Sequence, residues 1–428
     1  MATRPRFLMA GALALAAAPA VVAQGLAERI SRAPANAAIA FSFPARDGVC
    51  GGPGFVRYGT TVNVSSGSYS FSGDSESRPC LAGPVRVTVL RADNQVVGLE
   101  TGVGADAATR ESQDLGAVSG AVAAEYLLGL ARTVEGRPGQ SALLPAMLAA
   151  DANVLPALQA LATNRDLSRQ IRQSAISWLS READHLPGAQ ATAALETLSR
   201  MARDESDAPA IRESAMSALA RGGEGSGIPT LITLASSNDP WIARTAMGAL
   251  AGSGDPRARA HLRAAVRAGS RPDGVRVAAL KGLGRSYATA QDVAILREVY
   301  PSLSSQTERD AVLSAVGSAG GAANVQWLIS MARQEGEASA VSRALRAASQ
   351  AGATSADLIS LYDGLSDRSP RSTILGLLAE RGDRAAIDKL LAVAQGDTDP
   401  ALRRTAIQRL SNSNDPRVIA ALRDMVGR

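Results

Sequence analysis

Two cysteines are the residues of this chain whose chemistry is most tightly limited by number and spacing. Cys50 and Cys80 are its only cysteines and lie thirty positions apart in a sequence of 428 residues. A single pair without C-x-x-C spacing or a nearby histidine does not match a zinc or redox site. In an oxidising compartment such a pair forms a disulfide, and closing a loop of this length would contribute about 3 kcal/mol to stability. We therefore predict a Cys50–Cys80 disulfide.

Histidine, a frequent metal ligand and general base, occurs only twice. His185 and His261 are each followed by leucine. Neither lies in a sequence pattern with the further ligands of a metal site or the partner residues of a catalytic triad. The motifs G-x-S-x-G and G-x-x-x-x-G-K-[ST] are missing, and no G-x-G-x-x-G opens a helix,. We therefore expect a non-enzymatic protein without a catalytic residue, a cofactor or a metal ion.

The first residues resemble an export signal. Arg4 and Arg6 precede an apolar run over 7–22, which ends in small and aliphatic residues just before Gln24. This order of a basic start, an apolar run and a cleavage site is that of a secretory signal peptide. The run is shorter than the roughly 20 residues of a membrane-spanning helix. We predict a cleaved signal over residues 1–23 and a secreted or periplasmic chain that starts at about Gln24 with no stable membrane anchor; an uncleaved anchor is the alternative.

A nine-residue phrase repeats along the last two-thirds of the chain. An aliphatic residue stands at position one, usually arginine at position two, a small or apolar residue at position five, and an aliphatic residue at position nine, as in 171–179, 211–219 and 402–410. The position-five residues recur at steps of roughly thirty to forty residues, which is the period of a stacked solenoid. They are Ala175, Ala215, Ala246, Ala279, Val312, Ala344, Ile374 and Ala406.

Each period supplies two helices, the first of which carries the phrase. Positions one, five, six and nine fall on one face of a helix, and a second helix follows after a short break. Aspartate-proline pairs mark helix starts, because aspartate caps the N-terminus and proline at the first helical position lacks only an N–H that has no partner there. These pairs are Asp239-Pro240, Asp255-Pro256, Asp399-Pro400 and Asp415-Pro416.

The repeated phrase resembles that of HEAT repeats, in particular the short repeats related to phycobilisome lyases. The resemblance covers residues 143–428 and implies a mainly α protein, a right-handed α-solenoid of about eight HEAT-like helical hairpins. In that family the arginine at position two commonly pairs with an acidic residue of a neighbouring repeat. The alternative for this row of arginines is an anion-binding stripe. The resemblance thus implies a repeat-register role for Arg172, Arg212, Arg276 and Arg403.

The segment before the repeats alternates apolar and polar residues, which is typical of strands. Val85-Val87-Val89 and Val96-Val97-Leu99 flank Asp93-Asn94 like the two arms of a hairpin,. We predict a small β domain over 37–104, stapled by the disulfide. A linker and a capping helix follow over 105–142, with the helix at Gly116–Thr133, because the end of a solenoid needs a cover for its apolar face.

The charge of the chain does not identify a ligand. The formal net charge is +5 and the isoelectric point about 9.6, yet only two residues are lysine and no long basic run exists. Nucleic acid is therefore not an expected partner, because its recognition needs a clustered basic face. The one local cluster, five arginines between Arg257 and Arg271, indicates a solvated helix surface or, alternatively, a site for an anionic ligand.

These observations favour an exported scaffold that binds a protein partner through the concave surface of the solenoid. The oligomeric state is left open by the sequence. One alternative is a lyase-like enzyme of the HEAT type. Another is recognition of cell-wall glycan or peptide by the β domain, for which aromatic side chains would have to be exposed. The candidate aromatic residues are Phe55, Tyr58, Tyr69 and Phe71.

Overall fold

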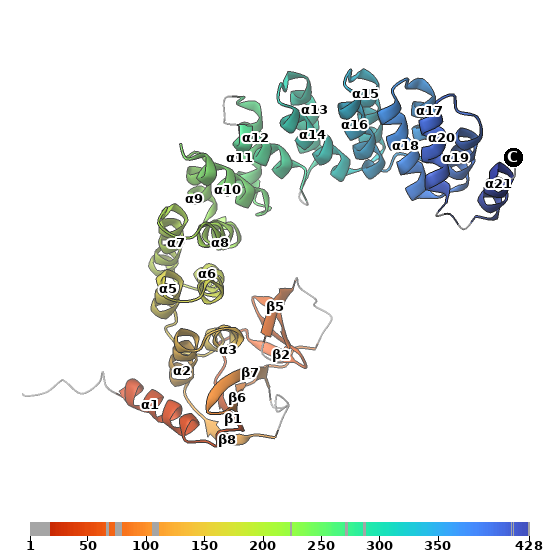
Figure 1. The fold of residues 1–428 in the computed structure, drawn as a ribbon. Coiled ribbons are helices and arrows are strands. Elements are labelled where there is room, and N and C mark those ends of the chain that lie inside the picture. The colour runs from red at the N-terminus through yellow and green to blue at the C-terminus, as the bar shows by residue number, and fades with distance from the viewer. Residues whose placement is uncertain are drawn as a thin grey trace, which may run out of the picture. The chain divides into compact units, whose positions relative to one another are not determined.

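The chain divides into two compact units, one up to Ser226 and one from Gly227 onward (Figure 1). The first 17 residues, which include Arg4, Arg6 and most of the predicted signal, lie outside the described residues. The computed structural model describes residues 18–65, 68–72, 79–104, 111–222, 225–269, 273–285, 288–411, 413 and 415–426.

The described residues of the first unit form two four-stranded sheets. The first sheet has the order β7-β6-β1-β8 and consists of β1 (Ala37–Phe43), β6 (Val85–Ala92), β7 (Gln95–Val103) and β8 (Gln113–Ala117). The β6–β7 hairpin is confirmed: Asp93 and Asn94 have φ angles of 49° and 63°, as its two-residue turn requires,. The apolar residues of β1 form the core of this sheet, because Ile39, Phe41 and Phe43 are buried.

The second sheet carries the disulfide. It consists of β2 (Cys50–Gly52), β3 (Phe55–Tyr58), β4 (Thr60–Ser65) and β5 (Ser68–Ser72), joined as an antiparallel meander in chain order. Cys50 in β2 and Cys80 form the predicted disulfide. Gly51 and Leu81 exchange backbone hydrogen bonds beside it, so the bond joins the second sheet to the segment that leads into β6.

The prediction of a helix from Gly116 is wrong at its start. Residues 113–117 form β8, which pairs in parallel with β1, and the helix α2 begins only at Gly120. Ser119 sets this start, because its side chain accepts the hydrogen bond of the Val122 N–H,. An Arg86–Asp114 ion pair at 2.9 Å also holds β8 to the sheet.

In the described part of the first unit, eight helices accompany the sheets. The helix α1 packs against α2, and Phe41 of β1 meets Tyr126 of α2 edge to face with ring centroids 6.0 Å apart. α1 runs through the predicted cleavage position before Gln24. The helices are α1 (Ala18–Ser31), α2 (Gly120–Thr133), α3 (Arg137–Ser141), α4 (Leu143–Met147), α5 (Leu155–Thr163), α6 (Arg169–Ala183), α7 (Gly188–Arg203) and α8 (Pro209–Arg221).

The second unit is entirely helical within its described residues. All four predicted aspartate-proline starts are confirmed, since each aspartate accepts a backbone N–H of its helix. The helices are α9 (Ile228–Ala235), α10 (Pro240–Ala251), α11 (Pro256–Arg267), α12 (Asp273–Leu283), α13 (Ala290–Val299) with the 3-10 turn η2 (Tyr300–Ser302), α14 (Gln306–Ala319), α15 (Ala322–Gln334), α16 (Ala338–Ala351), α17 (Ser355–Gly364), α18 (Arg368–Arg381), α19 (Arg384–Gly396), α20 (Pro400–Leu410) and α21 (Pro416–Val426).

The helices that carry the phrase, here called phrase helices, form one layer in each unit. They are α6 and α8 in the first unit and α10, α12, α14, α16, α18 and α20 in the second, and consecutive members pack side by side. All eight position-five residues are fully buried, which confirms the predicted period. In the second unit the phrase helices contact one another more extensively than the helices of the other layer do.

The order of the two helices within a repeat differs from the prediction. Most phrase helices contact the helix before them more extensively than the helix after them, so the phrase helix is the second of its hairpin. The arginine at position two contributes to the pairing of the phrase helix with the helix before it. Arg172, Arg212 and Arg276 each donate a hydrogen bond from Nε to a carbonyl ten residues earlier, at the end of the preceding helix.

Candidate functional site

The predicted register arginines make contacts between repeats or within a repeat and do not form an anion-binding stripe of unpaired side chains. Arg172 donates from Nη1 to the Asp207 carboxylate at 2.9 Å, and both side chains are 6% exposed. The hydrogen bond from Arg172 lowers the pKa of Asp207 below its ordinary value,. Asp207 stands just before the phrase of the next repeat, so this pair joins two neighbours.

The other predicted register arginines are of two kinds. Arg276 lies 3.5 Å from Glu308 of the next phrase and is bonded to the Val266 carbonyl. Arg212 and Arg403 donate to backbone carbonyls of their own repeats, at 3.4 Å and 2.6 Å. Contacts of these two residues therefore fix the phrase helix within its repeat.

Two further arginines at position two were missed, because their phrases begin with Glu308 and Pro370, where the pattern expects an aliphatic residue. Arg371 binds Asp397 at 2.6 Å, and Tyr362 donates to the same carboxylate. The same arrangement occurs two repeats earlier, where Arg309 pairs with Glu335 and the Tyr300 hydroxyl donates to the same carboxylate. The regular period was the signal that could have found them.

The arginine cluster at α11 is neutralised by aspartate and glutamate, which disfavours the anionic-ligand alternative. Arg257 pairs with Asp255, and Arg267 with Glu298, whereas Arg271 lies outside the described residues. The pair Arg259 and Arg263 shares the fully buried Asp292 at 2.6 Å each. Burial alone would raise the pKa of Asp292, but hydrogen bonds from Arg263, Thr289 and Arg259 lower it to about 2,.

The β element is fixed to the first phrase helix by a buried polar cluster. Arg46, from the loop after β1, donates to the Glu182 carboxylate at 2.7 Å and to the Tyr58 hydroxyl at 2.9 Å. Glu182 belongs to α6 and is fully buried. Tyr58 in turn stacks on His185, with ring centroids 4.6 Å apart. His185 therefore contributes to this joint, while His261 lies on α11 of the second unit.

A second contact places the β5 hairpin against α6. The Trp178 indole donates to the Tyr69 hydroxyl at 2.9 Å, and burial raises the pKa of Tyr69 to about 12. Around this pair lies a polar hollow of about 260 Å³ that also includes Gln173 and Ser174. Phe55 is buried in the β element itself. Of the aromatic residues proposed for glycan recognition, Phe55, Tyr58 and Tyr69 thus make contacts within the first unit. The Phe71 side chain lies outside the described residues.

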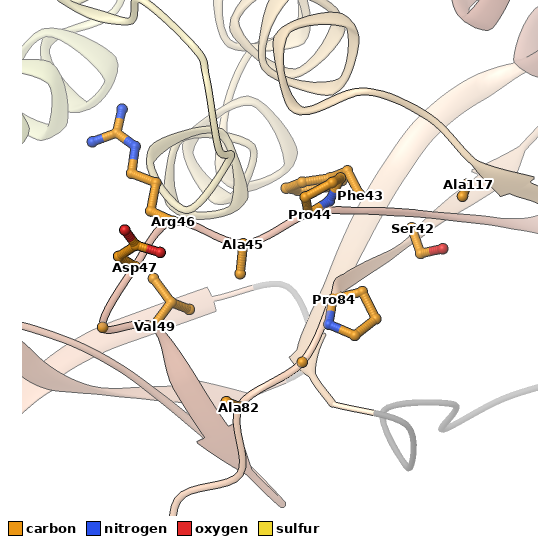
Figure 2. Close-up of a pocket in the computed structure, with 12 residues that line it drawn as sticks. Ser42, Phe43, Pro44, Ala45, Arg46, Asp47, Val49, Ala82, Pro84 and Ala117 are labelled. Carbon is orange, nitrogen blue, oxygen red and sulfur yellow. The ribbon is translucent and has the colours of Figure 1, made fainter.

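An apolar hollow lies in the β element, between the ends of the two sheets. Its volume is about 490 Å³, and it is lined by 42–49, 82–84 and Ala117. Figure 2 shows Ala45, Val49 and Pro84 around it, while the Arg46 side chain extends away from Asp47. Among the described residues no group of three or more histidine, cysteine, aspartate or glutamate side chains is arranged to hold a metal ion.

The exposed side of the phrase-helix layer is organised by a polar contact that repeats between neighbours. Position three of one phrase helix meets position four of the next. Gln173 donates to Ser214 at 3.0 Å, Arg343 pairs with Asp310 at 2.5 Å, and Thr373 donates to Ser342 at 3.2 Å. Positions three and four of neighbouring phrase helices are therefore in register along the layer. Position seven lies one helical turn after position three on the same face, so the layer offers a regularly spaced surface to an extended ligand.

The fold and this surface define an α-solenoid of stacked helical hairpins whose first repeat is covered by a β element. The family of HEAT repeats matches residues 196–273 and 355–428, so these two regions of the chain contain HEAT repeats. HEAT-repeat solenoids commonly mediate protein interactions. No helix within the described part of the chain is both long and apolar enough to cross a membrane.

Solved structures with a similar fold have low identity to this chain. The complex of CpcE and CpcF of phycocyanin lyase from Nostoc is 17% identical over 64% of this chain and 94% of that chain, with a TM-score of 0.29. A homology model of the AP-3 complex is 14% identical, covering 72% and 56% of the two chains, with a TM-score of 0.41. Kap121p bound to Nup53p is 13% identical, covering 68% and 39%, with a TM-score of 0.39. A comparison with curated protein sequences finds no match.

Proposed function

We propose that this protein is an exported, non-enzymatic scaffold that binds a protein partner through the exposed side of its phrase-helix layer. The observation that carries the proposal is the layer of the second unit, in which six phrase helices from α10 to α20 pack consecutively. Their close mutual packing is that of the inner, concave layer of a curved helical stack. Such a surface binds a partner across several repeats at once.

Export is supported by two separate observations. The basic start and apolar run over 4–22 have the order of a secretory signal,. The Cys50–Cys80 disulfide fits an oxidising compartment, since cytosolic thiols are kept reduced,. We propose the periplasm or the extracellular space, and a mature chain from about Gln24.

The test is affinity capture from an envelope extract of the source organism with the mature chain, followed by chemical cross-linking and mass spectrometry. We expect a protein retained in a fixed ratio, with cross-links to exposed residues of the phrase helices, such as Lys281 on α12. Cross-links confined to the other layer, for instance to Lys389 on α19, would contradict the proposed surface. Retention of wall polymer without any protein would contradict the scaffold role.

A further inference from the structure

The phrase-helix layer of the second unit has a surplus of positive charge that acidic residues of the chain do not neutralise. From it we infer that the partner is bound through an extended acidic segment lying across α10 to α20. This inference rests on the proposed function and specifies its partner. Six exposed cations carry it, and none has an acidic partner among the described residues: Arg244, Lys281, Arg346, Arg404 and Arg409 on the phrase helices, and Arg285 just after α12.

The other layer of the same unit is different, so the surplus is not a general property of a basic chain. There Arg263 pairs with Asp292, Lys389 with Asp363, and Arg417 with Asp388, each within 2.6 Å. On the phrase helices the exposed acidic residues are fewer, and Asp310 is already bound by Arg343. Positive charge is therefore available on one layer and largely neutralised on the other.

The spacing of the cations indicates the shape of the ligand. Lys281 on α12 and Arg346 on α16 both occupy position seven of the phrase and are exposed. The helix between them, α14, holds Ser314 at this position, and α10, α18 and α20 hold Gly248, Gly376 and Gln408, so the two position-seven cations stand two helices apart. Neighbouring helix axes lie about 10 Å apart, and an extended chain spans about 3.3 Å per residue. A segment that crosses the layer therefore meets Lys281 and Arg346 about six residues apart.

This arrangement suits spaced carboxylates better than a polyanion. Nucleic acid and polyphosphate carry a charge every few ångströms, so they need a contiguous row of cations. Here serine and glycine separate the cations, and each arginine can bind one carboxylate through two N–H groups. The small residues also let a peptide backbone approach the helices. The expected ligand is a protein segment with an acidic residue about every six positions and small neutral residues between.

The test uses the full mature chain and a labelled peptide of about 24 residues, with glutamate at every sixth position and serine or alanine elsewhere. The double variant Lys281→Glu/Arg346→Glu should bind it at least about tenfold more weakly. The matched control Arg333→Glu/Arg384→Glu makes the same charge change on exposed residues of the other layer and should bind it within about twofold of the unaltered chain,. Circular dichroism checks that both variants fold.

If both double variants bound the peptide equally weakly, the loss of binding would be due to overall charge, and the inference would be overturned. Equal binding of a peptide with glutamine in place of glutamate would overturn it too, as would a clear preference for inorganic polyphosphate over the glutamate peptide. A captured partner from the envelope extract separates the two proposals. If the partner binds Lys281→Glu/Arg346→Glu as well as the unaltered chain, the scaffold role stands and the acidic-segment inference fails.

Discussion

At the scale of single residues, Arg172 at position two of the first phrase joins its own repeat to the next one. Arg172 reaches back to the Ala162 carbonyl of the preceding helix and forward to Asp207 before the next phrase. A guanidinium suits this position because it donates several N–H groups in a fixed plane. Removal of one partner of such a buried pair leaves the other charge without compensation.

Arg172→Ala should therefore lower the free energy of unfolding by about 3 kcal/mol, since Asp207 and the Ala162 carbonyl lose a buried donor. Arg169→Ala, an exposed change on the same helix, should cost less than about 0.5 kcal/mol,. Urea unfolding of the two variants measures both values. A similar loss of unfolding free energy in the two variants would show that the buried Arg172–Asp207 pair contributes no more than an exposed residue.

The buried Asp292 gives a prediction for acid stability. Its pKa in the folded protein is about 2, below the ordinary value of 3.8. A carboxyl with a lowered folded pKa stabilises the fold above its unfolded pKa, and this contribution is lost as the pH falls through 3.8 towards 2. It amounts to about 2 kcal/mol.

We expect the free energy of unfolding of Asp292→Asn to be lower at pH 6 and to depend less on pH between 5 and 2 than that of the unaltered chain. Urea unfolding at a series of pH values measures this slope. Asp388→Asn is the control, because Asp388 is half exposed and its loss leaves no buried arginine. Parallel slopes for Asp292→Asn and the unaltered chain would contradict the assigned pKa.

At the scale of elements, the β element covers the first phrase helix, which has no preceding phrase helix to pack on. Trp178 at position eight of the phrase meets Tyr69, and Glu182 near the end of α6 meets Arg46. In the later repeats position eight holds mostly small residues that face the neighbouring helix, such as Ala315. In the first repeat, the contact of Trp178 with Tyr69 thus stands where later repeats have a contact between neighbouring helices.

Local patterns in the sequence predicted what local physics determines. The buried face of each phrase helix, the Asp-Pro caps and the turn at Asp93-Asn94 follow from residues close in the chain. The strand β8 and the joint of Arg46 with Glu182 could not be predicted in this way. Glu182 lies 136 residues from Arg46, and no periodicity records such a pairing. The grouping of the exposed cations on one layer could not be predicted either, because it depends on how the phrase helices pack side by side.

The disulfide should act on the element that contains it. Cys50→Ser should lower the stability of the β element by about 3 kcal/mol, because the open chain regains the freedom of the loop. Hydrogen exchange should show faster exchange in β2 to β5 and in α6, which they cover, with α14 to α20 unchanged. A reductant should produce the same pattern in the unaltered chain and no further change in the variant. Equal loss of protection in the second unit would contradict the confinement of this effect.

At the scale of the whole molecule, the chain combines a solenoid, whose repeats are stabilised by their neighbours, with one end closed by a different kind of structure. Stability in such a stack is approximately the sum of repeats and their interfaces. The helix α1 belongs to the closed end: Leu26 and Ile30 are buried, and Arg29 donates to the Leu115 carbonyl of β8 at 2.8 Å. These contacts all lie after Gln24, so removal of residues 1–23 preserves them.

Export of the whole chain is therefore compatible with its fold and can be tested directly. Produced from its full sequence in a bacterial host with a periplasm, the protein should be recovered there with an N-terminus at about Gln24 and without free thiols. The variant Arg4→Glu/Arg6→Glu removes the basic start of the signal and should leave an uncleaved precursor in the cytoplasm with Cys50 and Cys80 reduced. N-terminal sequencing and thiol labelling of each fraction measure this. An intact N-terminus on envelope-bound protein would instead establish a retained anchor, and thiol-containing protein in the cytoplasm for both chains would contradict export.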